Sequence, residues 1–239
     1  LSISRASMVV KTRRRLGLEA QYERAGAEGG EASVPGRELA VRENGLSFLV
    51  NIDDYIDTGL FMDHRPAREM VCGMASGKRV LNLFCYTGSF SVYALAGGAV
   101  AVVGVDLSNT YLAWAARNVA LNGFDGGRYR GVRSDVSAFL AVEAARGSRY
   151  DIIVLDPPTF SNSKKMEGFL DVARHWPDLV EACLAALEPD GTILFSTNAR
   201  SLKLDPALTP GASFKDISDR TIPEDFRGHP HRTWLVTRA

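Results

Sequence analysis

The sequence predicts an α/β fold, with a doubly wound, mostly parallel sheet and a small β appendage at the N-terminus. From Val80 onward, short apolar runs alternate with helical segments that end at glycine or proline turns, an order typical of parallel sheets covered by helices. Before Asp54 the chain differs, because strand-like residues there alternate around turn signals. The 239 residues are enough for one large domain and a small addition. We therefore expect the appendage over residues 1–53 and the main domain over residues 54–239.

One stretch has the order strand, glycine turn, helix, strand, acid. The apolar run Val80–Phe84 leads into the loop Cys85–Gly88, a helical segment follows, and the second run, Val100–Val105, ends at Asp106. This is the sequence form of a βαβ nucleotide-binding unit. The helix that begins after the loop points its free N–H groups at whatever the loop holds. An acid at the end of the second strand is placed to bind both hydroxyls of a ribose.

The loop also indicates which nucleotide is bound. The dinucleotide fingerprint G-x-G-x-x-G is absent, and Gly88 is the loop's only glycine, whereas a pyrophosphate normally needs several for close backbone approach. A ligand with ribose and adenine but no phosphate fits better, and S-adenosylmethionine is such a ligand. An ordinary βαβ unit that ends in an acid by chance is the alternative that this segment leaves open.

Composition sets the broad class of the protein. Apolar residues make up 46% and charged residues 23%, and the formal net charge is zero, so contact with a nucleic acid would have to be local. No apolar run approaches the roughly 20 residues of a membrane span, and no signal peptide is visible at the N-terminus. The three cysteines lack metal-ligand spacing, and we expect a cytoplasmic protein with free thiols.

The histidines do not suggest a metal site either. The chain has four of them, and we predict no metal centre. His229 and His231 lie on either side of a proline, and we expect both in a solvated loop.

The N-terminal part combines a hairpin with a basic segment. Residues 38–52 alternate around Asn44-Gly45, a pair typical of two-residue hairpin turns. Further upstream, Lys11 and Arg13 belong to a basic cluster that follows a short strand-like run. This cluster is suited either to RNA phosphates or to a solvated strand end, and the sequence leaves both open.

The remaining elements complete the alternating pattern. Pro66 suits the first turn of a helix over residues 67–74, and Ser108 is a good N-cap for a helix that ends at Asn122-Gly123. We expect further strands at 129–132, 151–155 and 192–196, helices at 136–145 and 169–187, and a turn at Pro189–Gly191. Two short strands at 214–217 and 234–236 have no long helix between them, which predicts an antiparallel hairpin at the sheet edge.

Ligands of open α/β sheets bind beyond the carboxyl ends of the strands. The loop at Tyr86, Thr87 and Gly88, together with Asp106, is expected there, as are Asp135 and the segment that begins at Asp156. Asp135 is suited either to the adenine amino group or to capping the helix that starts at Val136. The sequence leaves this choice open.

The segment Asp156-Pro157-Pro158-Thr159-Phe160 indicates a functional site more specifically than Asp135 does. Two prolines fix the backbone and remove two donors, which makes a rigid ledge able to face a planar substrate. Phe160 would stack on a base, with a role as a core aromatic as the alternative. The loop that follows holds Lys164 and Lys165, and it is expected either to close over RNA or to lie in solvent.

Three blocks resemble a known family. Residues 57–65 (DTGLFMDHR), 81–89 (LNLFCYTGS) and 156–164 (DPPTFSNSK) resemble class I S-adenosylmethionine-dependent 23S rRNA methyltransferases. They are most similar to the guanine-N7 methyltransferase domain that forms the C-terminal half of a bifunctional large-subunit enzyme. The likeness covers nearly the whole chain. It implies a seven-stranded Rossmann-like sheet, a 23S rRNA substrate, and an upstream portion of the family that is missing here.

The resemblance also implies roles for the matched residues. The cofactor site would comprise Phe61, Arg65, Asn82, Phe84, Tyr86, Thr87, Gly88, Asp106, Leu107, Asp135, Val136 and Asp156. Catalysis would rest on Asp156, Pro157, Pro158 and Phe160, and RNA contacts on Lys11, Arg13, Lys164 and Lys165.

The presence or absence of a catalytic cysteine indicates which base is methylated. Related enzymes methylate cytosine at C5 and need a cysteine to attack the ring, often after the fifth strand. Here that place is Phe195–Arg200, which contains no cysteine. Guanine N7 is a lone-pair nucleophile and needs only in-line alignment with the methyl group. The sequence thus favours guanine N7. A cytosine-C5 or exocyclic-amine methyltransferase and a non-catalytic RNA-binding module are the alternatives.

Overall fold

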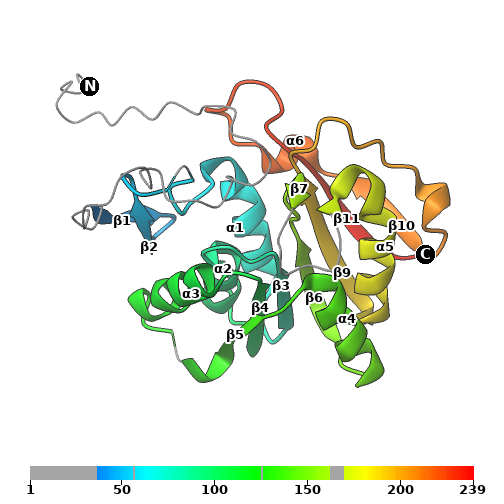
Figure 1. Ribbon diagram of the computed structural model, residues 1–239, viewed down its shortest axis with the longest axis horizontal. Helices are drawn as coiled ribbons and strands as arrows, with labels where there is room; N and C mark the ends of the chain where they lie inside the picture. Colours follow the sequence, from blue (N-terminus) through cyan, green and yellow to red (C-terminus); the bar gives the residue numbers. More distant parts are fainter. Residues whose placement is uncertain (1–36, 56, 125, 162–169) are drawn as a thin grey trace, which may run out of the picture.

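The computed structural model describes residues 37–55, 57–124, 126–161 and 170–239. Its centre is a seven-stranded sheet with the order β10-β11-β9-β6-β3-β4-β5, covered by helices on both faces (Figure 1). The five neighbouring strands β9, β6, β3, β4 and β5 pair in parallel, and β11 pairs antiparallel with both β9 and β10. The predicted α/β class, the mostly parallel sheet of seven strands and the antiparallel edge hairpin are therefore confirmed.

The strands lie close to the predicted positions. In chain order the sheet consists of β3 (Arg79–Leu83), β4 (Ala101–Asp106), β5 (Tyr129–Arg133), β6 (Tyr150–Leu155), β9 (Leu187–Thr197), β10 (Ala212–Asp216) and β11 (Arg232–Arg238). Two further strand pairs lie outside the sheet: β1 (Glu38–Glu43) with β2 (Leu46–Asn51), and the short β7 (Phe160–Ser161) with β8 (Leu170–Asp171).

The helices form the two outer layers. One layer has α1 (Arg65–Met74), α2 (Ser89–Ala96) and α3 (Asn109–Leu121), and the other has α4 (Val136–Ala145) and α5 (Val172–Ala185). The short α6 (Ser218–Thr221) contacts α1. Each layer packs on its own apolar core, one that includes Trp176 and one that includes Tyr93 and Phe48. Among the described residues, none of the helices has the length and apolar character needed to cross a membrane.

Two predicted boundaries are wrong. Pro189–Gly191 was expected to form a turn, but it lies inside β9, where the register with β6 shifts between Tyr150 and Ile152 and so accommodates the proline and glycine. The helix expected from residue 169 begins at Val172 instead. Asp171 caps it by accepting from the Ala173 amide at 3.0 Å, and the residues just before belong to β8.

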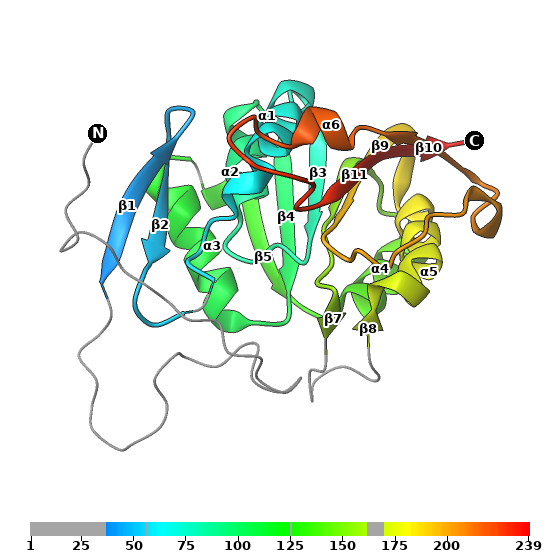
Figure 2. The same cartoon turned by 90° about the horizontal axis from the view of Figure 1, so that it is seen from above.

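The N-terminal hairpin packs on the helices α2 and α3. Its turn has positive φ angles at Asn44 (48°) and Gly45 (83°), as a two-residue hairpin turn requires. Figure 2 shows β1 and β2 beside α3, at the end of the molecule opposite β10 and β11. Asn118 of α3 accepts a hydrogen bond from the Leu49 amide at 2.8 Å. The division of domains at residue 53 stays a prediction, and the strand-like run at 8–10 lies outside the described residues.

Candidate cofactor and substrate site

The carboxyl ends of β3, β4, β5 and β6 meet at one edge of the sheet because these strands run in parallel. The Cys85–Gly88 loop follows β3, Asp106 ends β4, Asp135 follows β5 and Asp156 follows β6. The predicted cofactor and catalytic segments are thus brought to the same edge. We call this the strand-end site.

The loop after β3 is strained. Phe84 and Tyr86 have φ angles of 53° and 50°, which residues with a Cβ rarely adopt. Gly88 has φ 74° and precedes the first residue of α2. A Cβ on Gly88 would lie 2.6 Å from the Cβ of Ala115 in α3, so only glycine fits both the conformation and the packing. Such strain persists only where the surroundings hold it, and it is typical of ligand sites.

The segment Asp57–Gly59 supplies part of those surroundings. The Tyr86 hydroxyl donates to the Asp57 carbonyl at 2.9 Å, and the Thr87 hydroxyl donates to the Gly59 carbonyl at 2.6 Å. From α3, the Asn118 amide donates to the Thr87 carbonyl at 2.9 Å. Thr87 is buried, and its two hydrogen bonds hold the loop in place.

Asp106 is fixed by the backbone around it. Its Oδ2 accepts from the Tyr86 amide at 3.0 Å and its Oδ1 accepts from the Ser108 amide at 2.9 Å. Each carboxylate oxygen keeps a lone pair for a further donor, as two ribose hydroxyls would require. Burial raises the pKa of Asp106, and the hydrogen bonds from the Ser108, Tyr86 and Leu107 amides lower it and offset only part of that rise.

An aromatic group lies over the loop. The ring centroids of Tyr86 and Phe61 are 5.4 Å apart, and those of Tyr86 and Tyr111 are 4.6 Å apart. Phe61 is 46% exposed. The central ring, Tyr86, belongs to the residue whose amide donates to Asp106. Sequence reasoning missed Tyr111, because its position in α3 looks like an ordinary helical residue.

The ledge after β6 has a fixed start and an accessible end. Pro157 is buried and Pro158 is partly buried, while the Asp156 side chain is 30% exposed. The Thr159 hydroxyl donates to Oδ1 of Asn198, in the loop after β9. Phe160 is 36% exposed, so the alternative that it is a core aromatic is wrong. Asn198 is a second residue that the sequence analysis did not single out.

Other predicted cofactor residues have structural contacts. Asn82 is buried in β3 and donates to the Ser91 hydroxyl of α2 at 3.0 Å. Phe84 packs against the core and Val136 belongs to it, while Leu107 is partly buried. Arg65 donates to Asp225 at 2.8 Å. These contacts do not test the predicted cofactor roles.

Asp135 caps α4, because its carboxylate accepts from the Ala138 amide at 3.0 Å. The capping alternative is therefore confirmed, and the adenine contact stays a prediction. The proposed RNA-binding residues Lys11, Arg13, Lys164 and Lys165 lie outside the described residues.

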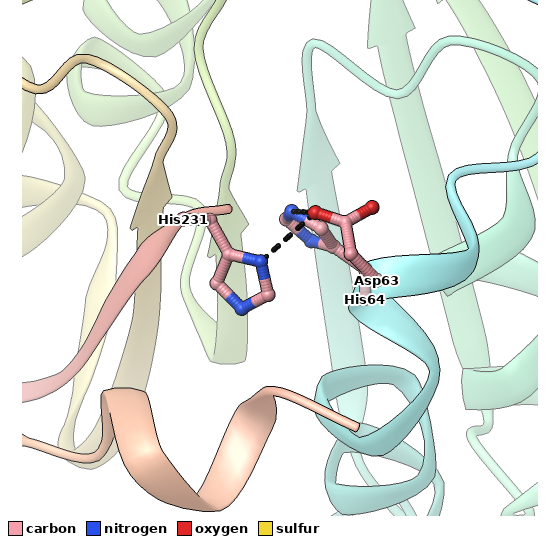
Figure 3. Close-up of side chains that lie close together, drawn as sticks. All are labelled: Asp63, His64 and His231. Atoms are coloured by element: carbon pink, nitrogen blue, oxygen red, sulfur yellow. Dashed lines mark hydrogen bonds and ion pairs between the residues drawn. The ribbon is translucent and has the colours of Figure 1, made fainter. Parts of the chain in front are cut away.

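A histidine cluster adjoins the ledge and was not predicted (Figure 3). Nδ1 of His231 lies 3.0 Å from Oδ2 of Asp63, and Nδ1 of His64 lies 3.8 Å from Oδ2 of Asp156. The expectation that His231 is solvated is wrong, since it is buried beside α6; His229 is exposed as expected. One ligand atom from each of Asp63, His64 and His231 lies within 4.8 Å of the others, a spacing that a metal ion tolerates, so the absence of a metal site stays a prediction.

The cysteines are poor nucleophiles. Cys85 and Cys183 are buried, and burial raises the pKa of both thiols; Asp106 raises that of Cys85 further. Cys72 is partly buried in α1, and burial raises its pKa too. A raised pKa keeps the thiol protonated and unreactive.

Fold and site together define the class of this protein. The sequence matches the profile of the S-adenosylmethionine-dependent methyltransferase family over residues 3–221. The chain belongs to this family, and its cofactor is S-adenosylmethionine.

Two relatives within this family are named as ribosomal RNA large subunit methyltransferases. The chain is 48% identical to the ribosomal RNA large subunit methyltransferase K of Neisseria meningitidis, over 93% of this chain and 61% of that protein. It is also 48% identical to the ribosomal RNA large subunit methyltransferase K/L of Stutzerimonas stutzeri, over 99% of this chain and 31% of that protein. The chain thus spans about three-fifths of one relative and a third of the other.

Solved structures agree on the fold. A methyltransferase designated SMU.776, complexed with SAH, is 26% identical with a TM-score of 0.72, and the match covers 87% of this chain and 57% of that one. An S-adenosylmethionine-dependent methyltransferase from Agrobacterium tumefaciens is 26% identical with a TM-score of 0.67, over 87% of this chain and 71% of that one.

Proposed function

We propose that this chain transfers the methyl group of S-adenosylmethionine to N7 of a guanine in 23S ribosomal RNA. The similarity to relatives named as ribosomal RNA large subunit methyltransferases supports the RNA substrate. The single observation that favours N7 is the absence of an available thiol. All three cysteines have raised pKa values, and none follows β9.

The cofactor in this proposal lies over the strained loop. Asp106 accepts hydrogen bonds from the two ribose hydroxyls, and its carboxylate is already oriented by the amides of Tyr86 and Ser108. The adenine lies against the exposed ring of Phe61, beside Tyr86. Residues Arg65, Asn82, Phe84, Leu107, Asp135 and Val136 are proposed to complete the site, through direct contact or by supporting the groups that make it.

The methyl transfer needs little from the enzyme beyond alignment. Guanine N7 has a free lone pair and no proton to lose, so neither covalent attack nor a general base is required. The chain holds N7, the methyl carbon and the sulfur in line. Positive charge moves from sulfur to the base, and the partly exposed carboxylate of Asp156 lies at the end of β6 to stabilise it.

The ledge positions the base in this proposal. Pro157 and Pro158 stiffen the backbone, and the Thr159–Asn198 hydrogen bond ties the ledge to the loop after β9. Phe160 presents a partly exposed ring on which an extruded guanine stacks. Lys11, Arg13, Lys164 and Lys165 are proposed to contact RNA phosphates. A ribosomal RNA substrate also implies that the protein acts in the cytoplasm.

Product analysis tests this function. Unmodified 23S rRNA is incubated with the protein and S-adenosylmethionine, digested to nucleosides and analysed by mass spectrometry. We expect 7-methylguanosine as the product, formed also by the Cys85→Ser and Cys183→Ser variants. If the product were 5-methylcytidine, or if either serine variant bound cofactor but lost activity, the cytosine-C5 alternative would replace this proposal. A methylated exocyclic amine would contradict it equally.

A further inference from the structure

His64 is held rigidly beside the ledge. It is buried, and its ring lies between Phe90, 5.9 Å away and nearly perpendicular, and His231, at a centroid distance of 4.2 Å. Figure 3 shows His64 and Asp63 on the segment that enters α1, facing His231 at the start of β11. A ring enclosed in this way has little freedom to rotate, so its two nitrogens face fixed directions.

Both nitrogens of His64 face carboxylates. Nδ1 lies 3.8 Å from Oδ2 of Asp156, and Nε2 lies 3.7 Å from Oδ2 of Asp63. Neither distance is a hydrogen bond, and among the described residues Nδ1 of His64 is a buried nitrogen with no hydrogen-bond partner. Such an atom in a folded protein calls for an explanation. The other titratable groups near this ring are His231 and Arg68.

The proton of His64 has one favourable place. Burial lowers the pKa of His64, although Asp156 raises it and His231 lowers it further, so the ring is neutral and carries one N–H. Asp63 already accepts a hydrogen bond from Nδ1 of His231 at 3.0 Å, and Nε2 of His231 lies 3.3 Å from the Thr221 hydroxyl. Asp63 thus has one donor already, whereas Nδ1 of His64 is the buried nitrogen without a hydrogen-bond partner and faces Asp156, so the N–H of His64 is best placed on Nδ1.

We propose that His64 is a positioning residue: its Nδ1–H donates to Asp156 in the loaded enzyme and holds that carboxylate in the orientation that methyl transfer requires. This rests on the proposed role of Asp156 at the substrate. The gap of 3.8 Å shortens to a hydrogen bond when ligands bind, as hydrogen bonds in unliganded sites often do. The hydrogen bonds of His231 with Asp63 and Thr221 fix the His231 ring, against which the His64 ring packs.

Two substitutions separate the nitrogens of His64. The amide nitrogen of asparagine occupies nearly the place of Nδ1, whereas that of glutamine reaches nearly the place of Nε2. For His64→Ala and His64→Gln we expect kcat to fall about 10- to 100-fold, the effect of one hydrogen bond to a charged group, with the affinity for S-adenosylmethionine unchanged. His64→Asn should regain most of the lost rate. The matched control is His229→Ala, an exposed histidine two residues from His231, which should keep full activity.

A spectroscopic measurement tests the same proposal without methyl transfer. Nitrogen-15 NMR of the histidine-labelled full chain, with the product SAH bound, should show His64 neutral with its proton on Nδ1, and Asp156→Ala should shift that signal. If rRNA were not methylated but this signal were as described, only the proposed function would fail. Equal activity of the asparagine and glutamine variants, or a proton on Nε2, would overturn the role of His64. So would calorimetric binding of Zn²⁺ that His231→Ala abolishes, because His64 would then be a metal ligand.

Discussion

Two regions of this molecule differ in how their polar groups are paired and exposed. The hairpin interface, where β1 and β2 meet α1 and α2, buries Glu43 with Arg68 and satisfies both. Arg68 donates to the two Glu43 carboxylate oxygens at 2.9 and 2.8 Å and to the Phe61 carbonyl at 2.9 Å, and Tyr93 adds a hydrogen bond to Glu43 at 3.0 Å. The strand-end site instead combines strained backbone at Phe84 and Tyr86 with a partly exposed Asp156.

The difference shows where this chain is organised for stability and where for binding. A buried charge pair with every partner present is rigid, and it is strongly destabilised when one member is removed. Strained torsions and unfilled hydrogen-bonding positions lower stability and are retained where a ligand uses them. Changes at the hairpin interface should therefore alter folding, whereas changes at the strand-end site should alter binding and rate.

The largest effect is expected from Arg68→Ala. Glu43 would remain buried without its partner, which typically costs about 3–5 kcal/mol in the free energy of unfolding. Urea unfolding measures this loss. The matched control is Arg117→Ala, which removes the ion pair of Arg117 with Glu38 on the surface and should cost about 0–1 kcal/mol. Equal losses in the two variants would contradict the contrast between a buried and an exposed pair.

Next in size is Asp106→Ala. The variant removes two charge-assisted hydrogen bonds to the ribose, and we expect the binding free energy of S-adenosylmethionine to weaken by roughly 2–4 kcal/mol. Calorimetry measures it, with Asp190→Ala as the control, since Asp190 is exposed in β9. Nicotinamide dinucleotides should bind neither protein. Unchanged affinity in Asp106→Ala would remove Asp106 from the cofactor site.

A smaller effect, on rate alone, is expected from Phe160→Ala. Stacking on a base is worth roughly 1–3 kcal/mol, so methylation should fall by about one to two orders of magnitude while cofactor affinity hardly changes. Phe160→Tyr and Phe160→Trp should keep most activity because both retain an aromatic face. Loss of folding in Phe160→Ala, or equal losses of cofactor binding and rate, would show that the ring has a different role.

The smallest effect concerns pH. Burial raises the pKa of Asp106, and the ribose needs the ionised carboxylate. Affinity for S-adenosylmethionine should therefore be constant at neutral pH and fall on acidification, beginning at a higher pH than the usual aspartate pKa of about 3.9 implies. Calorimetric titrations at decreasing pH measure this, and the Asp106→Ala variant should lack the dependence. A parallel decline in that variant would assign the effect to another group.

Much of the fold is predictable because it depends on local pattern. The periods of apolar residues, the Asn44-Gly45 turn and the Ser108 N-cap, which accepts from the Tyr111 amide, each act over a few residues. The two errors arise from pairing between distant segments. Pro189–Gly191 has turn chemistry, yet pairing of β9 with β6 draws it into a strand, and pairing with β7 takes Leu170 from the expected helix.

The site residues likewise fall into those that local pattern and topology predict and those that depend on distant contacts. Asp106 and Asp156 follow strands and were predictable from topology, because parallel strands end at one edge. His231 was not, since its proximity to Asp63 spans 168 positions in the chain and a His-Pro-His segment has the composition of a solvated loop. The positive φ angles at Phe84 and Tyr86 were equally hidden, because neither residue type favours that conformation.

Hydrogen–deuterium exchange with and without S-adenosylmethionine tests the central contrast most directly. If the strand-end site holds the cofactor, amides of residues 84–88 and 106–108 should exchange more slowly in its presence. Amides of β2, where Leu49 donates to Asn118, should exchange at the same rate in both conditions. Protection confined to the hairpin, or no protection of the loop after β3 at saturating cofactor, would contradict the account.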